Sequence, residues 1–378
     1  MGNNPGKVVK DLTDQAMGDI QKIDTSQYFY ITLSIIIFIL IILFGWIFDR
    51  LGLKDRSCNK LDLFYYTLDN KSYMNYDKTL KDYNKFDNSN STLINYYIKS
   101  AYNCCCGDSY KNNFVALCAL EKCISIGCRF LDFEIYSYNN EPIIASSTAN
   151  NNYIKETYNS LDLGTVLETI TNQAFDATKT NCANDPLILN FRIMSTNLAM
   201  LEKMGDLFET LLDINNGGNN EFTLLKEYNY SNTNNEITLL NKKMSTLYKK
   251  IIIICHFNPD KNIVNSAPKL KKYVNLLGDS QCILYRHNNI VSKGNNNRNL
   301  ISETQRKFVI VLPNLDNSNK NYDSTIAYNN GCHAICMKHQ YIDNNLLGYN
   351  NNFKNEGNYS FIIKKDELIN KSATDLGY

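Results

Sequence analysis

The sequence has little proline, glycine and tryptophan, and it has no excess of charge of either sign. Six Pro and 17 Gly among 378 residues exclude a collagen-like or proline-rich disordered chain. Lys and Arg together number 39 against 38 Asp and Glu, so the net charge is +1. Proteins that bind nucleic acids usually have a basic excess, so no nucleic-acid partner is expected. No two cysteines have the C-x-x-C spacing of a common zinc site.

Asparagine is the residue in excess. The chain has 56 Asn, beside 26 Tyr and 12 Cys. Enrichment of this kind is typical of AT-rich coding DNA, as in a large DNA virus, a protist or a parasite. Several cysteines lie inside apolar runs such as CALEKCISIGC and GCHAIC, where buried free thiols are the usual explanation. A reducing compartment therefore fits the cysteines better than a disulfide framework.

One segment departs from the composition of a soluble domain. Residues 28–48 (YFYITLSIIIFILIILFGWIF) are 21 residues without a charge, and they extend about 30 Å as a helix, the thickness of the bilayer core. Tyr28 and Trp46 suit the interfacial belt. The sequence thus predicts a single-pass membrane protein with a polar tail at 1–27 and membrane lipid as a partner. A buried core helix is the alternative. Slightly more basic residues follow the span than precede it, which favours a cytoplasmic position for the larger part.

After a polar segment at 49–93, interpreted as a stalk or linker, the chain alternates strands and helices. Strand-like apolar runs occupy 130–136, 142–145, 187–193, 251–255, 308–312, 334–337 and 359–363. Helical patterns occupy 115–125, 163–175 and 198–214, and Thr165 is a candidate helix cap. This alternation predicts an α/β fold, most simply a (β/α)₈ TIM-type barrel. Its two halves are expected at 94–214 and 246–370, separated by an Asn-rich insertion at 215–245.

Two blocks of motifs follow each other in this region. The first has GCRFLDFEIY at 127–136 and PLILNF at 186–191. The second has AYNNGCHA at 327–334 and GNYSFIIK at 357–364. In order and spacing these blocks resemble the X and Y regions of eukaryotic phosphoinositide-specific phospholipase C, a phosphoric diester hydrolase. The resemblance implies a distorted barrel whose active face is the carboxyl end of the strands.

The resemblance also implies which residues stand at the catalytic positions. In that family two His side chains handle the protons of the reaction. The matching stretches here are KSAYN at 99–103 and PIIASS at 142–147, so Tyr102 and Ser146 stand at the His positions. Both catalytic imidazoles are therefore absent. Only His256 and His339, which lie at expected strand ends, are candidates to replace them.

The family's Ca²⁺ site is only partly retained in this resemblance. Asn103 matches the metal-binding Asn, and Asp132 and Glu134 match an acid pair that one strand face would present together. A further carboxylate is replaced by Arg192. The guanidinium opposes a metal, so we favour a buried ion-pair cluster of Arg192 with the two acids. No cofactor is then expected, and Ca²⁺ only if catalysis is retained.

Recognition of the substrate phosphate is also weakened in this comparison. Of the residues that bind the substrate phosphate in the family, only Ser302 is retained. Arg192 is the other candidate for a substrate contact. A helix N-cap explains Ser302 equally well.

The sequence favours a membrane-anchored, phospholipase C-like barrel that has lost catalysis. It would serve as a structural, lipid-head-group or protein-binding module, with other membrane or virion proteins as partners, in a virion or host membrane. The first alternative is an active phosphodiesterase with rearranged catalytic residues. The second is a general membrane scaffold without any pocket function.

Overall fold

The computed structural model of the chain describes residues 10, 13–14, 25–69, 91–149, 154–213, 222–230, 239–258, 260–316 and 318–370. By its internal contacts the chain divides into two compact units, Met1–Leu53 and Lys54–Tyr378. The first unit contains one long apolar helix, and the second contains the predicted barrel.

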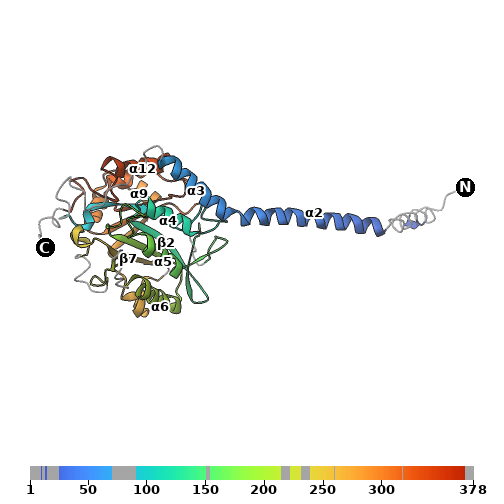
Figure 1. The fold of residues 1–378 in the computed structure, drawn as a ribbon, viewed down its shortest axis with the longest axis horizontal. Coiled ribbons are helices and arrows are strands. Elements are labelled where there is room, and N and C mark those ends of the chain that lie inside the picture. The colour runs from blue at the N-terminus through green and yellow to red at the C-terminus, as the bar shows by residue number, and fades with distance from the viewer. Residues whose placement is uncertain are drawn as a thin grey trace. The chain divides into compact units, whose positions relative to one another are not determined.

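Helix α2 (Thr25–Leu51) is continuous over 27 residues, which corresponds to about 40 Å (Figure 1). It contains the whole predicted span at 28–48. Its apolar side chains are exposed, with Phe38 at 64%, unlike those of a core helix. By length and composition α2 is therefore able to cross a membrane.

In the rest of the chain, strands and helices alternate. The strands are β1 (Tyr96–Ala101), β2 (Phe130–Tyr138), β3 (Glu141–Ala145), β4 (Leu161–Asp162), β5 (Leu187–Ile193), β6 (Thr223–Leu224), β7 (Lys250–Phe257), β8 (Leu276–Leu277), β9 (Cys282–Arg286), β10 (Phe308–Leu312), β11 (Ala334–Met337) and β12 (Phe361–Ile363). The α-helices are α3 (Leu53–Asp69), α4 (Leu117–Ser125), α5 (Leu163–Gln173), α6 (Leu198–Leu207), α8 (Pro268–Lys271), α9 (His287–Val291), α10 (Arg298–Thr304), α11 (Thr325–Asn329) and α12 (Asn344–Asn355). Shorter turns are η3 (Leu93–Asn95), η4 (Phe208–Leu212), η5 (Met244–Thr246) and η6 (Lys261–Ser266).

Eight of the described strands form a parallel ring. The hydrogen-bonded neighbours run β8–β7–β5–β2–β1–β11–β10–β9, and every one of these pairs is parallel. A bridge between Gly278, just after β8, and Cys282, the first residue of β9, joins the two ends. β3 and β12 add antiparallel strands to β2 and β1. This arrangement, with the helices around it, confirms the predicted (β/α)₈ barrel.

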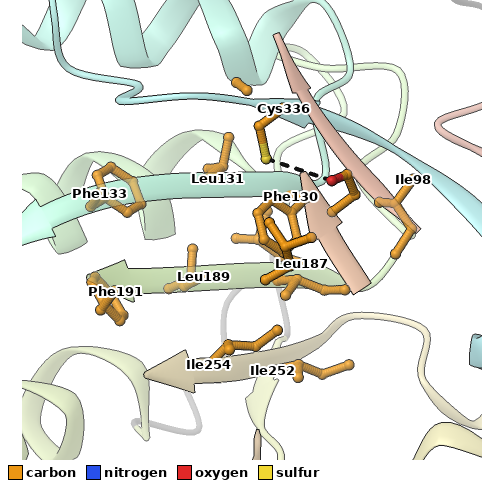
Figure 2. Packing of buried hydrophobic residues seen from close by; sticks show 14 of the residues in the cluster. Ile98, Phe130, Leu131, Phe133, Leu187, Leu189, Phe191, Ile252, Ile254 and Cys336 are labelled. Atoms are coloured by element: carbon orange, nitrogen blue, oxygen red, sulfur yellow. Dashed lines mark hydrogen bonds between the residues drawn. The ribbon is translucent and has the colours of Figure 1, made fainter. Parts of the chain in front are cut away.

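The strand register decides which side chains face the inside of the ring. Phe133 of β2 stacks on Phe191 of β5, with ring centroids 5.6 Å apart, and Phe191 packs at 5.3 Å on Phe208 of the surrounding helical layer. This row therefore faces outward, and Figure 2 shows Phe133 and Phe191 at the same end of the two strands. Because side chains alternate along a strand, their neighbours Asp132 and Glu134 face the inside.

The amino end of the ring is filled by apolar side chains. Phe130, Ile188 and Ile252 are in register on β2, β5 and β7, and all three are fully buried. Phe130 also stacks on Phe308 of β10, with ring centroids 6.1 Å apart. Polar residues enter the interior only further along the strands, so the core closes one end of the barrel and leaves the carboxyl end for a site.

Two sequence expectations near the barrel need correction. In the segment at 49–93, residues 49–51 are the end of α2, and helix α3 follows from Leu53. Helix α3 packs on the barrel through the buried side chains of Leu61 and Tyr65, whereas 70–90 lies outside the described residues. Thr165 does not cap α5, because the cap is Asp162, whose carboxylate accepts a hydrogen bond from the Thr165 backbone N–H.

The insertion at 215–245 is described only in part, since 214–221 and 231–238 lie outside the described residues. In the part that is described, β6 pairs with β7, so the insertion contributes a short strand to the sheet.

The cysteines depart in part from the sequence expectation. All 12 lie in the described part of the chain, and ten of them are buried free thiols, as expected. Cys58 of α3 and Cys118 of α4, however, form a disulfide. The expectation of a reducing environment rested on cysteines in apolar runs. It missed this pair because helix α3, which brings Cys58 to the barrel surface, was not predicted.

Candidate functional site at the carboxyl end of the barrel

The candidate site is built on the neighbouring strands β2 and β5. Register places Asp132 opposite Asn190 and Glu134 opposite Arg192. All four side chains face the inside of the ring, and all four are nearly fully buried. Two acids, an amide and a guanidinium therefore meet in the interior, close to the carboxyl ends of the two strands.

Arg192 lies between the two carboxylates. Its Nε and Nη2 donate to the two oxygens of Asp132, each at 2.9 Å, and its Nη1 donates to Oε1 of Glu134 at 2.7 Å. Nη2 also donates to Oδ1 of Asn103 at 2.6 Å. Asp132, Glu134 and Arg192 are 0%, 1% and 2% exposed. The ion-pair cluster that the sequence favoured is therefore present.

The surroundings keep the guanidinium charged. Burial by itself lowers the pKa of Arg192, but the negative charges of Asp132 and Glu134 outweigh burial and hold its pKa well above the ordinary value. The guanidinium carbon also lies 5.0 Å from the ring centroid of Tyr102, a cation–π distance. Arg192 thus acts as a permanent cation inside the barrel.

The residues of this cluster do not fit Ca²⁺. Each of the four carboxylate oxygens already accepts a hydrogen bond from Arg192, from Nδ2 of Asn190, or from the backbone N–H of Asn103 or Ser147. A Ca²⁺ ion takes about six to eight oxygen ligands and would meet the charge of Arg192. Within the described residues, no group of three or more His, Cys, Asp or Glu side chains is placed to hold a metal.

The residues at the predicted His positions lie next to this cluster. Tyr102 stacks its ring against Arg192, and burial raises the pKa of its phenol, which therefore stays protonated at neutral pH. Ser146 follows the β3 residue that pairs with Glu134, and its Oγ donates to the backbone oxygen of Tyr110 at 2.7 Å. Neither side chain accepts a proton near pH 7 as an imidazole does.

Loops from two sides cover the cluster. Nε2 of Gln340 donates to the backbone oxygen of Asn103 at 3.0 Å, and the Tyr110 hydroxyl donates to Oε1 of Gln340 at 3.5 Å. The Lys338 ammonium lies 4.9 Å from the centroid of the Tyr110 ring. Tyr102, Tyr110 and Gln340 are only 3%, 4% and 5% exposed. The cluster is therefore shielded from solvent in this structure.

Of the two histidines that could replace the missing imidazoles, His256 lies at the same level of the barrel as the Arg192 cluster. It is on β7 in register with Arg192, so it faces the same interior. Its Nε2 lies 3.8 Å from Sγ of Cys282, and its ring packs closely on Gly278. Burial lowers the pKa of His256 to about 4, so the ring is neutral at pH 7.

The second candidate, His339, packs between β1 and α12. Its Nε2 lies 3.2 Å from the backbone oxygen of Ser100 and 3.4 Å from Sγ of Cys128, and its ring meets Tyr349 edge-on. These partners belong to the outer layer of the barrel. The structure therefore does not bring His339 together with Arg192.

Ser302 is also separate from the cluster. It is exposed on α10, a helix that leads to the amino end of β10, whereas Arg192 lies near the carboxyl end of β5. The N-cap explanation is wrong, because α10 is capped by Asn297, whose side chain accepts from the Leu300 N–H.

Several residues of the cluster were not identified from the sequence. Asn190 was detectable, because it alternates with Arg192 on the predicted strand and must share its face. Ser147, Tyr110, Gln340 and Lys338 come from irregular loops, where no periodicity shows what a side chain contacts.

Comparisons with known proteins identify the fold. No family model and no curated protein matches the sequence. PLC21 from L. pealei and PLC21 from S. officinalis match in structure, each with a TM-score of 0.55 and 14% identity, over 73% and 74% of this chain. A calcium-dependent phosphoinositol-specific phospholipase C from Pseudomonas sp. matches 73% of this chain and 96% of its own, with 8% identity and a TM-score of 0.46.

This chain spans 38% of the length of each PLC21 chain that it matches. At 14% identity the likeness shows the fold alone. The second unit is thus a phospholipase C-like barrel, as the motif blocks predicted.

Proposed function

We propose that this chain is a membrane-anchored, phospholipase C-like barrel without phosphodiesterase activity, which serves as a structural and protein-binding module. The observation that carries the proposal is the position of Arg192 between Asp132 and Glu134. In this arrangement the two acids neutralise a side chain of the protein itself, so they are not available to a metal or to a substrate proton.

The chemistry of the fold's relatives needs groups that this site does not supply. Cleavage of a phosphodiester by an internal hydroxyl needs a base for the hydroxyl proton and an acid for the leaving group. Each such group typically contributes about 10²- to 10⁴-fold in rate. Tyr102 and Ser146 replace both, so we expect a loss of about 10⁴- to 10⁸-fold if the two contributions multiply.

The cover over the cluster supports a protein-binding role more than a lipid-head-group role. A lipid head group would have to displace the hydrogen bonds of Gln340 and the packing of Tyr110 before it reached Arg192. We therefore favour a role in which the outer surface of the barrel contacts other proteins at the membrane. One observation favours the active alternative, namely that the neutral ring of His256 faces the same interior as the cluster.

Anchoring is the second part of the proposal. Helix α2 provides an uncharged segment long enough for the hydrocarbon core, and only Gly52 separates it from α3 in the sequence. Resistance of the full-length chain to extraction by alkaline carbonate tests this anchoring.

An assay of the full-length protein tests the absence of catalysis. The chain, purified in detergent, is incubated with phosphatidylinositol vesicles in Ca²⁺ or in chelator, and released inositol phosphate is measured. We expect no release above the buffer background in either condition. The matched variant is His256→Gln. Release by the wild type that this variant abolishes would refute the proposal and establish His256 as a working base.

A further inference from the structure

Two cysteines differ from the other ten in their surroundings. Every free cysteine of this chain is buried, whereas Cys58 and Cys118 are only half-buried and form the disulfide. Their Cα atoms are 5.9 Å apart, within the usual range for a disulfide. The two sulfurs that a soluble oxidant can reach are therefore the two that the fold pairs.

The bond joins the helix next to the membrane span to the barrel. Cys58 lies on α3 and Cys118 on α4, 60 residues apart in the sequence. Other contacts between α3 and the barrel include the buried Leu61, the buried Tyr65, whose hydroxyl donates to the backbone oxygen of His339 at 2.9 Å, and the partly exposed ion pairs Lys60–Asp108 and Lys122–Asp62. Exposed ion pairs contribute little, whereas the disulfide is a covalent link in this contact.

We propose that Cys58–Cys118 is a structural disulfide, formed because the barrel lies on the oxidising side of its membrane, with the tail at 1–27 on the reducing side. The inference rests on the membrane anchor of the proposed function. It reverses the orientation that the excess of basic residues after the span favoured, but that excess is a single charge, four residues against three. Structural disulfides persist in oxidising compartments and are rare where thiols are kept reduced.

The reaction is a thiol–disulfide exchange. The thiols of Cys58 and Cys118 lose two protons and two electrons as the S–S bond forms, and the disulfide of an oxidised oxidoreductase or of glutathione disulfide takes them up and becomes two thiols.

The buried thiols are poor competitors for this reaction. Burial raises the pKa of Cys104 and that of Cys106 to about 12, so at neutral pH almost none of either is thiolate. Exchange is thereby directed to the half-buried pair.

Counting thiols in the full-length chain tests the bond. Membranes from cells that produce the protein are quenched in acid, denatured, and alkylated with a polyethylene-glycol maleimide, before and after reduction. We expect ten modified cysteines before reduction and 12 after it. The double variant C58S/C118S should give ten in both cases. The control Cys255→Ser, a buried cysteine outside the pair, should give nine and 11. Twelve modified cysteines in the wild type before reduction would overturn the proposal.

Protease treatment of sealed vesicles tests the side of the membrane. We expect an epitope at the N-terminus to be removed without detergent and the barrel to be protected until detergent is added. A barrel digested in intact vesicles would overturn the inference, even if the disulfide is present. A chain released by alkaline carbonate would refute the anchor and this inference together. A chain that is retained but has 12 free thiols would refute the inference alone.

Discussion

Replacement of Arg192 by Gln tests the reasoning about the site most directly. The change keeps a polar side chain of similar reach and removes the charge that Asp132 and Glu134 share. Two carboxylates then remain in the barrel interior, 0% and 1% exposed, without a cation between them. We expect the variant to fold less stably and to gain an affinity for divalent cations that the wild type lacks.

The magnitude follows from the burial of the pair. Removal of one partner of a buried ion pair typically costs about 3–5 kcal/mol, because an uncompensated charge stays behind. With a denaturant slope of about 3 kcal/mol/M, the urea midpoint should fall by about 1–2 M. If Ca²⁺ occupies the vacated position, a concentration of about 100 times its Kd should restore about 2.7 kcal/mol.

The assay is urea unfolding of the full-length chain in detergent, followed by circular dichroism, with Ca²⁺ or with chelator. The matched control is Lys203→Gln, which removes an exposed ion pair with Glu141. Because both of those side chains are more than 40% exposed, little change is expected there. If Arg192→Gln is as stable as the control, or if Ca²⁺ stabilises the wild type as much as the variant, the account of Arg192 as an internal cation is refuted.

Three further predictions follow from other contacts. Burial lowers the folded-state pKa of His256 from 6.5 to about 4, so between these pH values the unfolded chain binds more protons than the folded one, and stability should fall by at most about 3 kcal/mol as the pH drops from 6.5 to 4. In urea unfolding measured across this pH range, His256→Gln should remove that dependence, and an unchanged pH dependence would contradict the prediction. A Cβ at Gly278 would overlap the His256 ring, so Gly278→Ala should cost about 1–3 kcal/mol, and much less in a His256→Ala background if the ring is the cause. Reduction of Cys58–Cys118 opens a 60-residue loop and should lower stability by about 4 kcal/mol on the chain-entropy estimate. A C58S/C118S variant with the same melting temperature in calorimetry as the oxidised wild type would refute this.

The sequence predicted the strands whose pattern is local. β10 and β11 have the predicted boundaries, because continuous apolar runs of strand length reflect burial on both faces. β5 has them too, although Asn190 and Arg192 interrupt its apolar run. Three strands of the ring, β1, β8 and β9, were not predicted. β8 has only two residues, and the residues of β9 after Cys282 are only partly buried, so neither has a clear pattern.

The division between local and non-local information also applies to the site. The sequence by itself determined an uncharged span at 28–48, an acid pair on one strand face, and the absence of an imidazole at positions 102 and 146, since each depends only on residue type and spacing. The sequence favoured an ion-pair cluster of Arg192 with Asp132 and Glu134 over a metal site, but only the tertiary structure decided between them, because the contact depends on the register between β2 and β5. The cover by Tyr110 and Gln340 and the pairing of two distant cysteines depend in the same way on loops and helices that meet only after the ring has closed.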